Sequence, residues 1–112
     1  MTFLSMPVIE ENIKTLISDI DMISGFLYNL EKTKAFNILV KVIDKQKAIL
    51  DSFPDQIEKF DFMNKFNLLC VDINSAIENN DLVLLNDLLR YGIKELNQKL
   101  LEFFEVYNDE LH

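Results

Sequence analysis

Apolar side chains recur every three or four residues along almost the whole sequence, and this spacing is the strongest constraint on its fold. The first such stripe consists of Ile9, Ile13, Leu16, Ile17, Ile20, Ile23, Leu27 and Leu30. Because an α-helix turns once in about 3.6 residues, these side chains share one face of a helix. The pattern predicts a helix over residues 7–30.

Three further stripes follow, and short polar segments separate them. The second contains Phe36, Leu39, Val40, Ile43 and Leu50; the third contains Ile57, Phe60, Met63, Phe66, Leu69, Cys70, Ile73 and Ile77; the fourth contains Leu85, Leu88, Leu89, Leu96, Leu100, Phe103 and Tyr107. Pro54 ends the second helix near Ser52, because the residue before a proline avoids helical geometry. In the polar run 79–81, asparagine can take left-handed backbone angles and Asp81 can cap a fourth helix over residues 82–108.

The junction between the first two stripes is less clearly marked. Residues 29–34 contain neither glycine nor proline. The phase of the apolar pattern changes there and Thr33 could cap a new helix, so we predict a tight turn. Short connections make successive helices antiparallel neighbours. The expected fold is a single all-α domain over residues 1–112, an up-down-up-down four-helix bundle, and the alternative is three helices with the first two continuous.

Acidic side chains outnumber basic ones by 19 to 11, which gives a formal net charge of −8. Phosphate backbones and anionic lipid surfaces repel such a chain, so we expect neither a nucleic acid nor a membrane as its partner. Cys70 is the only cysteine and cannot form an internal disulfide, which is typical of a reducing compartment. The sequence shows no signal-peptide pattern and no membrane-spanning apolar run, so we expect a soluble, cytoplasmic protein.

No group of residues has the spacing that catalysis or metal binding requires. His112 is the only histidine and stands at the end of the sequence, where it is a poor catalytic base. Cys70 falls within an apolar stripe, where a buried thiol is inert. Paired-cysteine, Glu-x-x-His and glycine-rich phosphate motifs are absent from the sequence. We therefore predict a protein that is not an enzyme and has no cofactor and no metal site.

Gly25 and Gly92 are the only glycines, and both fall inside predicted helices. A glycine in a helix interior costs about 1 kcal/mol relative to alanine. Gly92 also interrupts the fourth stripe between Leu89 and Leu96. This pattern fits either a close approach by another helix or a partner, or a slight kink that the helix tolerates.

The chain contains more large apolar side chains than the interior of four helices needs. We interpret the surplus as an interaction surface on a non-catalytic helical module, an adaptor or chaperone-like protein that holds a partner helix in an apolar groove. The candidate contacts are Phe60, Phe62, Phe66, Phe103 and Tyr107. The alternative is a structural homo-oligomer, such as a homodimer, in which two copies bury the surplus faces.

Residues 81–91 form the most distinctive segment, because its apolar residues wrap more than one helical face. Asp87 and Arg90 are three residues apart and can pair across one turn. With Tyr91 they are candidate partner-binding residues, a polar patch beside an apolar groove. The alternative interpretation is a helix start that its neighbours bury.

The run AIENND at 76–81, followed by leucines and Asp87 and Tyr91 in LNDLLRY at 85–91, resembles a pattern in small helical proteins encoded beside bacterial flagellar or motility genes. The resemblance covers about the last third of the chain. It implies a helical accessory protein and transfers no functional residue.

Overall fold

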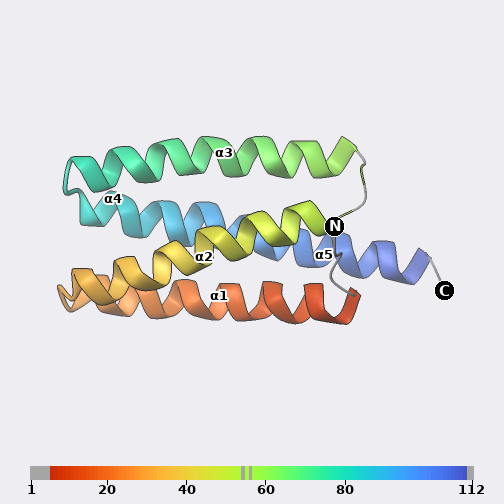
Figure 1. Cartoon of the computed structure of the whole chain (residues 1–112), viewed down its shortest axis with the longest axis horizontal. Helices are drawn as coiled ribbons and strands as arrows, with labels where there is room; N and C mark the ends of the chain where they lie inside the picture. The colour runs from red at the N-terminus through yellow and green to blue at the C-terminus, as the bar shows by residue number, and fades with distance from the viewer. Residues whose placement is uncertain (1–5, 54, 56, 111–112) are drawn as a thin grey trace.

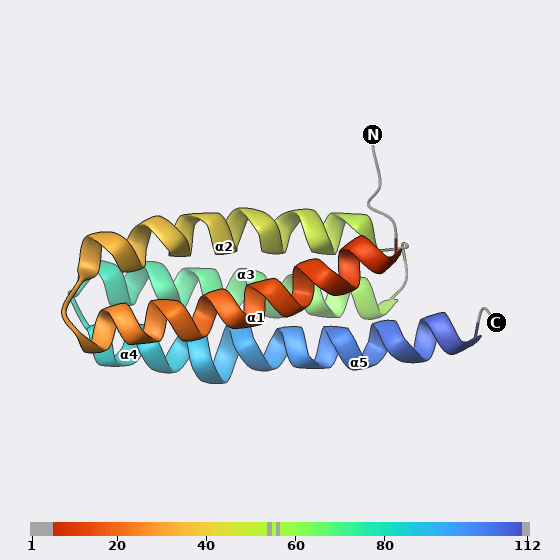
Figure 2. The same cartoon turned by 90° about the horizontal axis from the view of Figure 1, so that it is seen from below.

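Four helical rods run alternately up and down along the long axis of the molecule, joined by short turns (Figures 1 and 2). The structure is a computed structural model that describes residues 6–53, 55 and 57–110. The elements are α1 (Met6–Tyr28), α2 (Lys32–Ser52), α3 (Ile57–Glu78), α4 (Leu82–Asp87), the π-helical segment η1 (Leu88–Ile93) and α5 (Lys94–Glu110). The last three form one continuous rod, and no strand occurs in the described residues. The predicted all-α four-helix bundle is confirmed.

The turn between α1 and α2 shows that the first two helices are separate, so the alternative of one continuous helix is wrong. Leu30 takes a left-handed conformation, with φ of 60°. The N–H groups of Leu30 and Glu31 donate to the carbonyl oxygens of Leu27 and Phe26, at 3.1 and 2.8 Å. This is the Schellman arrangement that closes helix ends, formed here on a leucine rather than on glycine. Glu31 precedes α2, so Thr33 lies inside its first turn and does not cap it.

The turn between α3 and α4 repeats the same arrangement at the same end of the bundle (Figure 1). Asn80 has φ of 51°, and the N–H of Asp81 donates to the carbonyl oxygen of Ala76 at 2.8 Å. The Asp81 carboxylate accepts from the N–H of Leu84 at 3.0 Å, as the sequence predicted for a capping residue. The Nζ of Lys32 donates to the Asn80 side chain and so links the two turns.

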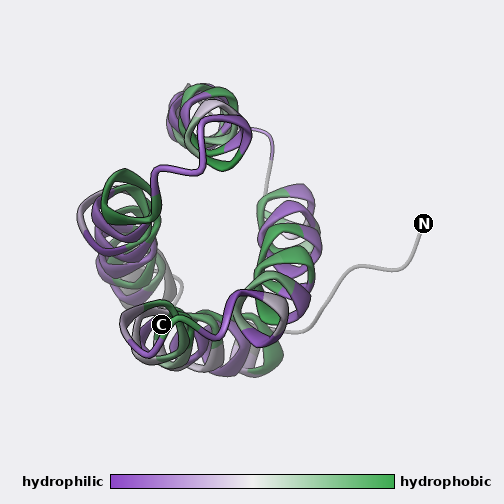
Figure 3. Cartoon of the chain, turned by 90° about the vertical axis from the view of Figure 1, so that its left-hand side faces the viewer, coloured by the Kyte–Doolittle hydropathy of each residue, from purple (hydrophilic) through white to green (hydrophobic). Residues whose placement is uncertain are grey.

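Helix α1 packs against both α2 and α5, and Figure 3 shows the four rods arranged around a common interior. All but two of the predicted first-stripe side chains are buried there, namely Ile9, Ile13, Leu16, Ile20, Ile23 and Leu27. Ion pairs on either side reinforce the arrangement. Asp19 contacts Lys45 of α2 at 3.6 Å, and Asp21 contacts Lys94 of α5 at 2.8 Å. Such partly exposed pairs contribute at most about 1 kcal/mol each, so buried apolar area is the main stabilising factor.

The fourth rod differs from the uninterrupted α-helix predicted over residues 82–108. Its residues Leu88–Ile93 are π-helical, and the rod ends at Glu110. The buried residues Leu85, Leu89 and Ile93 follow one another in steps of four. Because an α-helix has about 3.6 residues per turn, such steps drift away from the core, and a wider turn keeps them on the inner face.

Gly92 lies in this wide turn, directly against α3. A Cβ atom built on Gly92 would lie 2.4 Å from the Cδ2 atom of Leu69, well inside contact distance. Gly92 therefore leaves room for the Leu69 side chain of α3, so the close approach that its position in the stripe allowed is made by a side chain of the neighbouring helix. Gly25 differs, because it is exposed and has no atom within 4 Å of such a Cβ.

The two glycines predict opposite responses to alanine. Gly25→Ala should raise the free energy of unfolding by about 0.5–1 kcal/mol, since it adds helix propensity without a clash. Gly92→Ala should lower it, because the Leu69 side chain or the rod must shift. Urea denaturation of the two variants measures both effects. Equal stabilisation by the two substitutions would show that the α3 contact does not require glycine.

Two amide side chains, Gln46 of α2 and Asn97 of α5, are fully buried inside the bundle. The Nδ2 of Asn97 donates to the Oε1 of Gln46 and, at 2.8 Å, to the carbonyl oxygen of Ile93. The remaining polar atoms of the pair, Gln46 Nε2 and Asn97 Oδ1, have no hydrogen-bond partner. Because an unpaired buried polar group is costly, the pair specifies the relative positions of its helices at the expense of stability.

A double-mutant cycle tests this role of the amide pair. Asn97→Leu should cost about 1–3 kcal/mol, because it leaves the Gln46 amide buried without a partner. Adding Gln46→Leu should cost less than Asn97→Leu alone, since neither buried amide then remains unpaired. Denaturation midpoints of the single and double variants give the coupling. A double variant whose free energy of unfolding falls by more than the sum of the two single variants would contradict this role of the pair.

Candidate functional site

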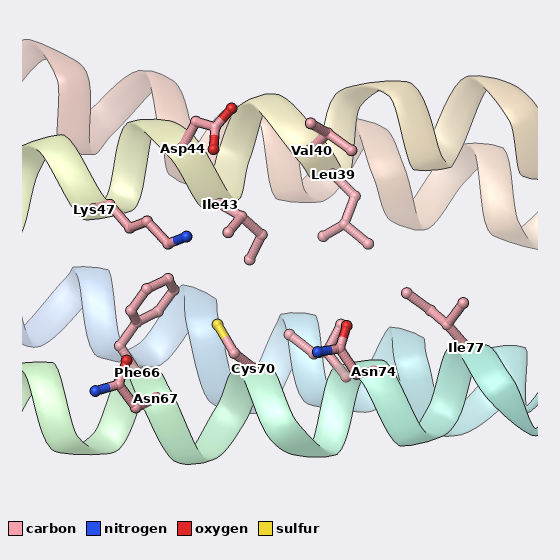
Figure 4. Close-up of a pocket in the computed structure, with 11 residues that line it drawn as sticks. Leu39, Val40, Ile43, Asp44, Lys47, Phe66, Asn67, Cys70, Asn74 and Ile77 are labelled. Carbon is pink, nitrogen blue, oxygen red and sulfur yellow. The ribbon is translucent and has the colours of Figure 1, made fainter.

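The main open feature of the structure is a groove between α2 and α3, the neighbouring rods that contact each other least. Its larger part is a cavity of about 380 Å³. Figure 4 shows the residues that line it, which are Leu39, Val40, Ile43, Asp44 and Lys47 from α2 and Phe66, Asn67, Cys70, Ile73, Asn74 and Ile77 from α3. Most of these side chains are apolar, and the polar ones stand nearer the mouth.

A second cavity of about 230 Å³ continues the groove toward the α2–α3 turn. Leu50, Asp51 and Met63 line it, together with Lys47, Phe66 and Asn67, which also line the larger cavity. From Met63 to Ile77 the groove follows α3 for about four turns, or about 20 Å at 1.5 Å per residue. We call the two cavities together the α2–α3 groove.

The groove has a buried floor and an exposed edge. Leu39, Phe66 and Ile73 form the floor and are at most 4% exposed. Val40 stands at the edge with 62% of its surface exposed, although it belongs to the apolar stripe of its helix. Cys70, on the α3 wall, is half-buried, so its exposure lies between that of the floor and that of the edge. An apolar wall that remains open to solvent is the kind of surface that another molecule covers.

Lys47 extends along the side of α2 that faces Phe66 and Cys70, whereas Asp44 points away from α3 (Figure 4). Burial raises the pKa of the Cys70 thiol, and the positive charge of Lys47 opposes that shift by favouring the thiolate. Thus the thiol is mostly protonated near neutral pH and is a weak nucleophile.

The pH dependence of alkylation tests this environment of Cys70. Because only the thiolate reacts, the reaction rate should rise with pH to a midpoint above that of the urea-unfolded chain. Lys47→Gln should move the midpoint still higher, since it removes the charge that stabilises the thiolate. Lys41→Gln, on the same helix but outside the groove, is the control and should leave the midpoint unchanged. A lower midpoint in Lys47→Gln would contradict the assignment.

The structure separates the aromatic residues predicted as partner contacts. Phe66 lies on the groove floor, whereas Phe60 is exposed outside the residues that line the groove. Phe62 and Phe103 pack together, with ring centroids 6.1 Å apart, and Phe103 lies 6.1 Å from Phe53. These three rings therefore help to close the end of the bundle. The side chain of Tyr107 and all of His112 lie outside the described residues.

The predicted polar patch lies elsewhere. Asp87 ends α4, while Arg90 and Tyr91 belong to η1, and all three are exposed. Among the described residues, Asp87 and Arg90 form no ion pair; instead the Arg90 guanidinium lies 5.7 Å from the centre of the Tyr91 ring. Tyr91 lines a cavity of about 260 Å³ beside Gly92, between α3 and the fourth rod. The patch is therefore not part of the α2–α3 groove.

Sequence reasoning did not single out Val40, Ile43, Lys47 or Cys70 as members of one site. The available signal was that Val40 and Ile43 widen the second stripe beyond the core face of the helix. That signal predicts only the α2 wall of the groove, because the position of the α3 wall depends on the distance between the two helices. Within the described residues, no three His, Cys, Asp or Glu side chains gather closely enough to hold a metal ion.

The family model described as a domain of unknown function (DUF8042) matches residues 6–103, and the chain belongs to this family. The match includes every residue that lines the α2–α3 groove. No curated protein and no solved structure matches the chain significantly. In the described part of the chain, every helix is too short or too polar to cross a lipid bilayer.

Proposed function

We propose that this member of the family is a non-catalytic binding module, which holds an amphipathic helix of a protein partner in the α2–α3 groove. The observation that carries the proposal is a long apolar groove, open to solvent, between two rods of an otherwise closely packed bundle. Its length of about four turns corresponds to a partner segment of about 14 residues.

The walls of the groove suit a helix because both are helices themselves. Apolar side chains line both walls, with Val40, Ile43 and Leu50 on α2 and Met63 and Cys70 on α3, and Lys47 interrupts the α2 wall between Ile43 and Leu50. A partner helix would place its own apolar residues at intervals of three, four and seven against these walls. Burying an exposed valine such as Val40 completely contributes about 1.5–3 kcal/mol.

The edges of the groove are polar. Asn67 and Asn74 stand seven residues apart on α3, and the exposed Asp44 and Asp51 stand seven residues apart on α2. A polar rim around an apolar centre is typical of protein interfaces, where the rim supplies hydrogen bonds and registration.

A second copy of the chain is the alternative occupant, and it would make the protein a structural homo-oligomer. The motility association that the sequence resemblance implies, an adaptor or chaperone-like role and the cytoplasmic location expected from the single free cysteine are part of the same proposal. These three proposals concern which protein supplies the partner helix. The groove indicates only that the partner segment is a helix.

A displayed library of helical peptides about 14 residues long tests the proposal. We expect the protein to select amphipathic sequences whose binding is lost, by at least about tenfold, in Val40→Glu, because a carboxylate at the groove edge opposes burial of an apolar face. Val83→Glu is the matched control, since Val83 is also an exposed helical valine but lies on α4, outside the groove. It should bind the selected peptides like the unchanged protein.

Selected peptides that are insensitive to Val40→Glu, or a library that yields no binders, would refute helix binding in the groove. Sedimentation equilibrium separates the homo-oligomer. A dimer that Val40→Glu dissociates and Val83→Glu does not would assign the groove to a second copy, whereas a concentration-independent monomer would remove that alternative.

A further inference from the structure

We propose that the partner helix carries a carboxylate in the middle of its apolar stripe and that this carboxylate pairs with Lys47. The inference rests on the proposed function and specifies the chemistry of the partner. It follows from the position of Lys47, from the absence of an internal counter-ion for it, and from the division of the groove that it creates.

Lys47 is exposed and stands where the two cavities of the groove meet, about midway along its length. It lines both the larger and the smaller cavity, as do Phe66 and Asn67. Its ammonium group lies on the side of α2 that faces Phe66 and Cys70, and its charge acts on the Cys70 thiol (Figure 4). A helix that covers the groove must therefore pass over this positive charge.

Lys47 lacks an ion-pair partner among the described residues, although its own helix offers two. Asp44 and Asp51 stand three and four residues away, the spacings at which helical side chains meet. Neither carboxylate lies within 4.0 Å of the ammonium. At the same spacings elsewhere, Lys34 pairs with Glu31 and Lys59 with Asp55. Lys47 instead extends into the groove.

An apolar helix laid over Lys47 would remove water from an unpaired cation, which is strongly unfavourable. A carboxylate on the partner offsets that loss with a charge-assisted hydrogen bond. The net charge of −8 on the chain does not prevent this pairing. Solvent-exposed charges are screened beyond about 8 Å at physiological ionic strength. Asp44 and Asp51 also line the groove, so the partner's carboxylate must lie closer to the Lys47 ammonium than to either of them.

The division of the groove predicts a spacing as well. The two cavities meet at Lys47 and Phe66, and their centres lie about two helical turns apart along α3, from Met63 toward Cys70 and Asn74. A partner helix would fill them with apolar side chains seven residues apart. The carboxylate would stand between these anchors, three or four residues from each.

Parallel selections from the displayed peptide library test the inference. The baits are the unchanged protein, Lys47→Glu and, as a matched control on the same helix outside the groove, Lys41→Glu. We expect Glu or Asp to be enriched between the two apolar anchors with the unchanged protein and with Lys41→Glu. Lys47→Glu should instead enrich Lys or Arg there. In the tightest peptide, changing the central acid to Gln should weaken binding to the unchanged protein by about tenfold or more.

Two results overturn the inference and are distinguishable from each other. Groove binders with the same central residue for all three baits would reject the Lys47 pairing and leave helix binding intact. If no bait yields a binder that depends on Val40, the proposed function fails and the inference fails with it. Circular dichroism of each bait establishes that the charge reversals leave the helical fold unchanged.

Discussion

The burial of one face of α1 is the interaction on which the rest of the structure depends. Six side chains of its stripe are buried, and the helix packs against α2 on one side and α5 on the other. The α1–α2 pair and the pair formed by α3 and the fourth rod are thus joined mainly along α1. Since α2 contacts α3 only sparsely, the bundle is closed along α1 and open opposite it, which is where the groove lies.

Much of this fold could be predicted because its signals are local. The stripes located all four rods, Pro54 and the polar run 79–81 located two turns, and Asp81 was recognisable as a cap. The sequence signal for the turn at Leu30 was weaker. A leucine in the left-handed conformation is unfavourable by about 1–2 kcal/mol, and no residue typical of such a turn occurs there. Packing of both flanking helices against the core enforces that turn, so its cause is tertiary.

The candidate site was less predictable because it depends on distances between helices. The aromatic residues that we expected to bind a partner were chosen for size; Phe66 lies on the groove floor, whereas the half-buried Phe62 and Phe103 pack against each other. The amides of Gln46 and Asn97 are buried although their residue types favour the surface. The contact of Gly92 with the Leu69 side chain likewise depends on how α3 stands against the fourth rod, which periodicity within one helix does not report.

An open groove between apolar walls needs a reason not to collapse. If α2 moved against α3, the exposed polar side chains that line the groove, which are Asp44, Lys47 and Asp51 on α2 and Asn67 and Asn74 on α3, would lose water, and this loss is unfavourable unless new hydrogen bonds replace it. The buried Gln46–Asn97 pair also opposes movement of α2 within the bundle, since sliding the helix would break its hydrogen bond. Under the proposed function, the polar groups that line the open groove are also the groups that an incoming helix must satisfy, so one set of side chains would determine both the unoccupied shape and the choice of partner.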